Sequence, residues 1–156
     1  VSFADGMRMK SADVKRAVFR PPLKVSDAKF RVNYRKKYFE TQPGYFCPAL
    51  SQVFDDSHKF KYVLADPPHA QSPLANAERV RGNVALIDRG MVAYGDKVRH
   101  AEAAGAVAVI IGNNDEEMPD AVSEFNARAN IPFVMVSFND AAKLKQSTKC
   151  KAYFKR

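Results

Sequence analysis

The chain lacks any long apolar run. Its longest apolar stretch is residues 106–111, whereas a helix that crosses a bilayer needs about 20 consecutive apolar residues. We therefore expect no membrane-spanning helix, and no N-terminal stretch has the charged-then-apolar pattern of a secretory signal peptide. Glycine (7 residues) and proline (9 residues) are few and form no low-complexity tract, which excludes a fibrous or disordered chain.

The chain also lacks the short motifs of common hydrolase and nucleotide sites. It contains no HExxH, no GxSxG and no P-loop, so a zinc-protease helix, a nucleophile elbow and a phosphate cradle are not indicated. Of its three histidines, His58 and His69 lie near several aspartates. These histidines and aspartates can form a metal site only if the loops that carry them lie close together in the fold. The alternative is that they are solvent-exposed loop residues. We expect no catalytic centre, no metal site and no cofactor.

Cysteine is scarce, with only Cys47 and Cys150, 103 residues apart. No CxxC is present, and no Cys/His spacing matches a structural zinc site. Two distant cysteines are compatible with one disulfide in an oxidising compartment or with two buried free thiols. Composition leaves both possibilities open.

The positive charge is concentrated in the first quarter of the chain. The net charge of the 156 residues is +8, and residues 1–40 hold 11 lysines and arginines against 4 aspartates and glutamates. The remaining residues hold 14 against 13. We therefore divide the chain into a basic N-terminal arm, residues 1–40, and one globular domain, residues 41–156. This asymmetry indicates an anionic partner.

Apolar and polar residues partly alternate over residues 29–39, which predicts a strand. Its cations are either a solvated face or an anion-binding site for an acidic polysaccharide, an acidic protein or mineral phosphate. Interleaved aromatic residues would also allow contacts to phosphates and stacking on bases, although we expect nucleic acid less than the other partners. The cations concerned are Arg31, Arg35, Lys36 and Lys37.

The second half predicts a parallel strand–helix–strand unit over residues 84–111. The apolar run at 84–87 is typical of a buried strand. Residues 94–104 then predict an amphipathic helix that ends at Gly105, where a left-handed residue is favoured. A second apolar run follows at 107–111, and such a connection between parallel strands is right-handed. The helix residues expected to face the sheet are Val98 and Ala101.

The rest of the chain predicts short strands and one further short helix. Residues 66–80 predict a surface loop with about one helical turn, and residues 113–117 form an acidic loop. Ser137 or Asn139 can cap the short helix. The strands are expected at 45–53, 60–64, 132–136 and 150–154, and the helix at 140–146.

Several motifs follow one another in a distinctive order. They are Arg89-Gly90 after a strand, Tyr94 and Lys97 on the helix, Ala104-Gly105-Ala106 at its end, Asn113-Asn114 after the next strand, and Ile131-Pro132 before a third. Over residues 61–145 this order resembles the protease-associated (PA) domain family. Residues 64–68 also resemble secreted, single-domain members. The resemblance implies a mixed α/β fold, with a β-rich core of two packed sheets flanked by a few helices.

The resemblance further implies a non-catalytic module that binds a protein or peptide and is secreted or lies in the lumen of the secretory pathway. Sorting receptors of the family use the Arg-Gly loop for cargo. For Arg89 and Gly90 the alternative is purely structural, a turn glycine and an ion pair with a neighbouring acid. The ligand-binding residues expected here are Arg89, Gly90, Met91, Asn113 and Asn114.

The chain departs from the family at its cysteines. Members commonly carry a cysteine two residues after the arginine, where this chain has Met91 or Val92, and a partner cysteine in a loop that here reads His69-Ala70-Gln71. Because members mostly occupy oxidising compartments, the resemblance implies instead a disulfide between Cys47 and Cys150.

Overall fold

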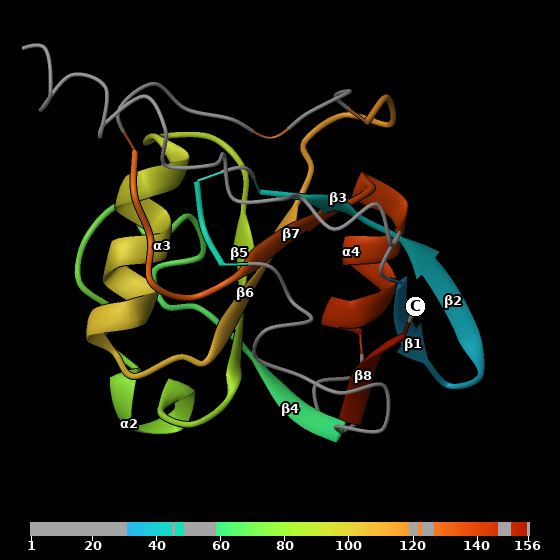
Figure 1. The fold of residues 1–156 in the computed structure, drawn as a ribbon, viewed down its shortest axis with the longest axis horizontal. Coiled ribbons are helices and arrows are strands. Elements are labelled where there is room, and N and C mark those ends of the chain that lie inside the picture. The colour runs from blue at the N-terminus through green and yellow to red at the C-terminus, as the bar shows by residue number, and fades with distance from the viewer. Residues whose placement is uncertain are drawn as a thin grey trace, which may run out of the picture.

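The structure is a computed structural model that describes residues 31–44, 46–48, 59–118, 122, 127–146 and 151–155. Figure 1 shows its helices and strands along the chain. The strands are β1 (Arg31–Tyr34), β2 (Lys37–Glu40), β3 (Gln42–Pro43), β4 (Lys59–Leu64), β5 (Val84–Asp88), β6 (Ala108–Gly112), β7 (Phe133–Val136) and β8 (Lys151–Lys155). The helices are α2 (Ala77–Val80), α3 (Tyr94–Ala103) and α4 (Phe138–Lys145).

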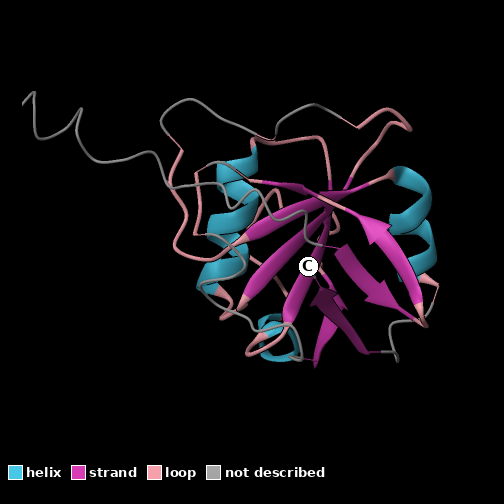
Figure 2. Ribbon diagram, turned by 45° about the vertical axis from the view of Figure 1, so that its right-hand side comes forward, coloured by secondary structure: helices cyan, strands magenta, loops and turns pink. Residues whose placement is uncertain are grey.

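Four parallel strands, β4 to β7, form the centre of the sheet, with α3 and α4 on either side of it (Figure 2). Every residue of β6 and β7 is buried, as expected for parallel strands covered on both faces. The predicted unit at 84–111 is present as β5–α3–β6, with parallel strands. Val98 and Ala101 are fully buried, so the prediction that they face the sheet is confirmed.

The remaining strands are mostly antiparallel, and β4 joins them to the parallel part. Its first half, from Lys59 to Lys61, pairs with β8, and its second half, from Tyr62 to Leu64, pairs with β5. The strands therefore run in one continuous order, β2-β1-β8-β4-β5-β6-β7-β3. The predicted mixed α/β class is confirmed, and the parallel and antiparallel parts of the sheet are continuous through β4.

The two faces of the parallel strands bury two different cores. Alternate residues of a strand point to opposite faces. Val84 and Leu86 accordingly lie in a core with α4 and the β1–β2 hairpin, whereas Ala85 and Ile87 lie in a core with α3. Each helix is thus held against its own face of the sheet.

The predicted strand at 29–39 is wrong in its length, because the chain reverses within it. Arg35 and Lys36 have φ values of +50° and +61° and link β1 to β2 as a two-residue hairpin turn. Such a turn usually contains asparagine or glycine, so Arg-Lys gives no sequence signal for it. Residues 31–40 therefore lie in the same sheet as the domain. The division at residue 41 stays a prediction, since residues 1–30 lie outside the described residues.

Other boundaries shifted by small amounts. The helix predicted at 140–146 begins at Phe138, and Ser137 caps it through its Oγ, which accepts from Asp140 N at 3.1 Å. A two-residue strand forms at Gln42–Pro43, while most of the strand predicted at 45–53 falls outside the described residues. Among the described helices, none has the length and apolar character needed to cross a membrane.

Gly112 at the end of β6 permits α4 to approach the sheet closely. A Cβ atom built on Gly112 would lie 2.6 Å from the Cβ of Ala141 in α4. We expect Gly112→Ala to lower the free energy of unfolding by about 1–3 kcal/mol, the usual cost of overpacking. Urea denaturation measures the change.

Ala141→Gly provides the matched control, because it removes the opposing methyl group. In the double variant the two changes should partly compensate, with a coupling free energy of about 1 kcal/mol between the sites. Strictly additive losses would contradict the close contact between Gly112 and Ala141.

Candidate functional site

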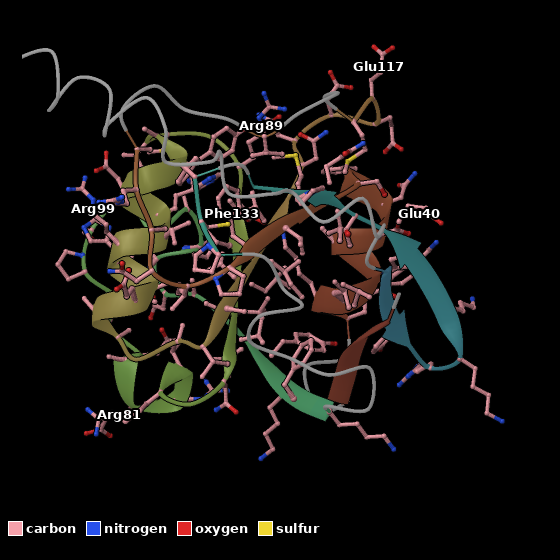
Figure 3. All side chains as sticks on the ribbon, viewed as in Figure 1. Glu40, Arg81, Arg89, Arg99, Glu117 and Phe133 are labelled. Carbon is pink, nitrogen blue, oxygen red and sulfur yellow. The ribbon has the colours of Figure 1, made fainter. Side chains whose placement is uncertain are left out.

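The carboxyl ends of the parallel strands bring the predicted ligand-binding residues to one edge of the sheet. Asp88 pairs with Gly112, and Gly112 pairs with Val136, so β5, β6 and β7 end side by side. Figure 3 shows Arg89 and Glu117 at this end of the molecule and Arg81 at the opposite end. Ligands of open α/β sheets bind outside the carboxyl ends of strands. We call this region, residues 88–94 and 113–118, the carboxyl-edge site.

Arg89 is fixed at the site by its neighbours on two loops. Its Nη1 donates to Asn113 Oδ1 at 2.7 Å, and its guanidinium lies 5.9 Å from the centroid of the Tyr94 ring. Within the described part of the chain, no carboxylate forms a salt bridge with Arg89. Arginine carries five N–H donors, so the bond to Asn113 leaves further donors for a ligand.

The acidic residues that could have paired with Arg89 have other partners. Asp88 pairs with Lys145, Asp96 pairs with Arg99, and Glu102 accepts from the Asn130 amide. The structural alternative for Arg89, an ion pair with one of these three acids, is therefore not found. The guanidinium charge remains at the edge of the sheet.

Asn113 is buried, and its amide forms its hydrogen bonds inside the protein. Its Nδ2 donates to Asp115 O at 2.8 Å and to Glu117 O at 2.9 Å, while its Oδ1 accepts from Arg89 and from Asn114 N. Only 3% of Asn113 is exposed. Both hydrogens and both lone pairs of its amide are thus used inside the protein. Asn113 shapes the loop, and the exposed Asn114 is the neighbouring side chain that a ligand can reach.

Lys97 fastens the Arg-Gly loop to helix α3. Its side chain is fully buried, and its Nζ donates to Gly90 O at 2.6 Å and to His69 O at 2.5 Å. Gly90 has φ +105° and Met91 has φ +70°. A left-handed conformation costs a residue with a Cβ about 1 kcal/mol. The hydrogen bond from Lys97 to Gly90 O therefore stabilises a turn whose conformation is unfavourable for Met91. Met91 itself is 72% exposed.

Two histidines contact the loops that Lys97 joins. His100 Nδ1 is 2.7 Å from Ala70 O, so α3 also contacts the loop before α2. The His69 ring lies beside Gly90, and its Nδ1 is buried without a hydrogen-bond partner in the described structure. The sequence pattern indicates no role for Lys97 beyond its place in the motif and none of these contacts, because their acceptors are backbone carbonyls.

Burial lowers the pKa of Lys97 from 10.5 to about 8, and the nearby Asp88 carboxylate opposes part of this shift. Desolvation disfavours the charged form of a lysine. At neutral pH the ammonium is still the main form, and it places a positive charge below the Arg-Gly loop. The described residues contain no group of three His, Cys, Asp or Glu side chains that could hold a metal ion.

The predicted anion-binding cations lie elsewhere on the molecule. Arg35 and Lys36 form the exposed turn of the β1–β2 hairpin, and Lys37 follows it. The side chain of Arg31 lies outside the described residues. The sheet order separates this hairpin from β5 and β6 by β8 and β4. The two predicted sets of site residues therefore form two separate surfaces.

Cys47 is a buried free thiol in the structure. Its Sγ lies 3.5 Å from Gly44 O and accepts from Phe133 N at 3.4 Å. Burial raises the pKa of the thiol to about 11, while the hydrogen bond from Phe133 opposes the shift. Cys150 lies outside the described residues, so the disulfide between the two cysteines stays a prediction.

A known protein family matches the part of the chain that contains the carboxyl-edge site. The PA domain family matches residues 56–144, which include both loops of the carboxyl-edge site. Signal peptide peptidase-like 3 of Arabidopsis thaliana is 32% identical over 105 residues, which are 65% of this chain and 19% of that protein. PRADC1-like protein of Drosophila melanogaster is 45% identical over 58 residues, 37% of this chain and 30% of that protein.

Solved structures show the same fold within larger chains. A zinc aminopeptidase from Bacillus subtilis has a TM-score of 0.63 and 27% identity, covering 81% of this chain and 30% of its own. An aminopeptidase from Aneurinibacillus sp. strain AM-1 has a TM-score of 0.55 at 20% identity, covering 83% of this chain and 30% of its own. The chain thus spans less than a third of the length of these proteins.

The contacts of Lys97 predict a loss of stability in Lys97→Met. Methionine fills a similar volume but donates to neither carbonyl, and hydrogen bonds to charged groups contribute about 1.5–3 kcal/mol. We expect a loss of roughly 2 kcal/mol at pH 7, together with faster hydrogen exchange in residues 89–92. Lys143→Met, at an exposed position of α4, is the control and should change stability little.

The lowered pKa also gives the Lys97 contribution a defined pH dependence. Between about pH 8 and pH 10.5 the folded protein has released a proton that the unfolded chain still holds. The free energy of unfolding therefore rises with pH in this window. The neutral amine keeps two N–H donors, so both carbonyl bonds persist.

Urea titrations at several pH values measure the difference between wild type and Lys97→Met. This difference should increase from pH 8 to pH 10.5 by at most about 3 kcal/mol, since one pKa unit corresponds to about 1.4 kcal/mol. A difference that is constant or shrinks across the window would show that the Lys97 pKa is not lowered.

Burial of Cys47 predicts that its thiol is protected in the folded protein. Because the pKa is raised to about 11 and the thiolate is the reactive form, a reduced Cys47 should react with a thiol reagent only after unfolding. Mass spectrometry after alkylation, with and without denaturant but without reductant, locates the label. Absence of label at Cys47 in denaturant would show that this cysteine is oxidised, as the predicted disulfide requires.

Proposed function

Since the chain belongs to the PA domain family, we propose that it is a non-catalytic module that binds a segment of another protein or a peptide at the carboxyl-edge site. The observation that carries the proposal is the environment of the Arg89 guanidinium. Its guanidinium is held in place by Asn113 and Tyr94 yet forms no salt bridge with a described residue. A fixed guanidinium with remaining donors suits a carboxylate or a backbone carbonyl.

The Arg-Gly loop adds room for a backbone. Gly90 has no side chain, and a Cβ placed there would meet its nearest atom, Asn114 Nδ2, only at 3.8 Å. A bound main chain can therefore come close to the loop beside Arg89. Because the Gly90 carbonyl already accepts from Lys97, the loop is held in place before a ligand arrives, which lowers the entropic cost of binding.

Apolar and acidic groups at the same edge of the sheet as Arg89 indicate the chemistry of the bound segment. Met91 is 72% exposed and Phe138 is 51% exposed, and both follow carboxyl ends of parallel strands. The loop between them carries the exposed acids Asp115, Glu116 and Glu117. A matching segment would offer an apolar side chain, a basic residue and a carbonyl or carboxylate for Arg89.

The relatives and structures named as peptidases share with this chain only a part of their length. Together with the family match, this supports a binding role for the chain in place of a catalytic one. We also propose that the module acts outside the cell or in the lumen of the secretory pathway, a proposal that rests on the family resemblance alone. Fractionation of cells that express the full-length tagged gene product tests the location.

Substitution of Arg89 tests the proposed site. A peptide selected from a displayed random library against the wild-type protein serves as the ligand, and its affinity is measured by calorimetry. Arg89→Lys keeps the charge but loses the planar fork, and we expect it to weaken binding about tenfold, equivalent to about 1.4 kcal/mol.

Arg81→Lys is the matched control, because Arg81 lies at the opposite end of the molecule (Figure 3). It should bind the peptide as wild type does. Equal affinities of all three proteins for every selected peptide, with the variants still folded, would place the binding surface elsewhere.

A further inference from the structure

A concave site lies away from the carboxyl-edge site, between the β1–β2 hairpin and α4. Figure 1 shows the hairpin beside this helix. The cavity has a volume of about 310 Å³. Its walls come from both elements and are lined by Tyr34, Arg35, Lys37, Phe39, Lys143 and Gln146. We call it the hairpin pocket.

The lining of the hairpin pocket is strongly positive. Arg35, Lys37 and Lys143 contribute three cations, and no carboxylate is among the lining residues. Lys143 forms a salt bridge with Asp140, whose Oδ1 lies 3.6 Å from Lys143 Nζ, and the side chains of Asp140 and Lys143 are 22% and 51% exposed. An exposed pair of this kind contributes little, so Asp140 competes only weakly with an anion in the pocket for Lys143.

Aromatic rings hold two of these cations at the pocket wall. The guanidinium of Arg35 lies 5.4 Å from the Tyr34 ring centroid, and Lys143 Nζ lies 5.8 Å from that of Phe39. The two rings are 6.0 Å apart and only 5% and 3% exposed. Because the rings belong to the hydrophobic core, the sheet and α4 position the cations above them.

We propose that the hairpin pocket binds an acidic sugar unit of a sulfated or uronic-acid polysaccharide. The three cations take the sulfate or carboxylate group. The Gln146 amide both donates and accepts, which suits sugar hydroxyl groups. The cavity of about 310 Å³ is larger than a single oxyanion would fill, so it has room for a sugar ring together with its acidic group.

The burial of the two rings argues against nucleic acid as the ligand. Proteins that bind single strands stack bases on exposed aromatic faces, whereas Tyr34 and Phe39 present almost no surface to solvent. The pocket therefore offers charge and hydrogen bonds without a stacking platform. It also lies apart from Arg89, so a polysaccharide and a peptide could be bound at the same time.

A heparin-derived tetrasaccharide, which carries both sulfate and uronate groups, is the probe. Calorimetry measures its affinity for wild type, Lys37→Gln, Lys143→Gln and Lys36→Gln at one salt concentration. Lys36 has the same charge and lies in the same turn, but it does not line the pocket. We expect a loss of about tenfold for Lys37→Gln and for Lys143→Gln, and less than about twofold for Lys36→Gln.

Equal losses in all three variants would overturn the pocket in favour of a diffuse basic surface, and unchanged binding in all three would place the sugar elsewhere. An oligoglutamate peptide and an oligothymidylate of matched charge are titrated in parallel. Either of them binding as tightly as the tetrasaccharide would refute the sugar assignment. Arg89→Lys should bind the tetrasaccharide as wild type does, which separates this outcome from the fate of the peptide site.

Discussion

A buried lysine ties together the segments that form the carboxyl-edge site. Lys97 lies on α3 without solvent exposure, and its Nζ donates to carbonyls of two different loops, those of Gly90 and His69. Burying an amine is costly unless it is hydrogen-bonded, so this arrangement persists only while both loops stay in place. The left-handed Gly90-Met91 turn, and with it the position of Arg89, depends on that bond.

The same sheet supports two surfaces with different chemistry. The carboxyl ends of the parallel strands carry a fixed arginine, exposed apolar side chains and an acidic loop. On the antiparallel side, a hairpin and α4 enclose three cations around a small cavity. Since β4 belongs to both halves of the sheet, the two surfaces are parts of one fold and are held at a constant separation.

The sequence predicted the strands that consist of apolar runs, but it did not predict the contacts that side chains make with backbone groups. The apolar runs of β5, β6 and β7 identified the parallel core. The hairpin was missed because Arg35-Lys36 lacks the residues typical of its turn. Lys97 and Asn113 contact mainly backbone carbonyls, which no side-chain pattern reveals. Asn113 was expected to contact a ligand because of its place in the motif. In the structure it is buried, and its amide donates to carbonyls of the acidic loop.

Hydrogen exchange with and without a selected peptide tests most directly whether the carboxyl ends of the parallel strands form the binding surface. We predict slower exchange in residues 89–92 and 113–117 on binding, and the same two segments should lose that protection in Arg89→Lys at equal peptide concentration. Exchange in residues 34–39, on the hairpin, should not change. Protection confined to the hairpin, or absent from both loops while the peptide is bound, would contradict the account.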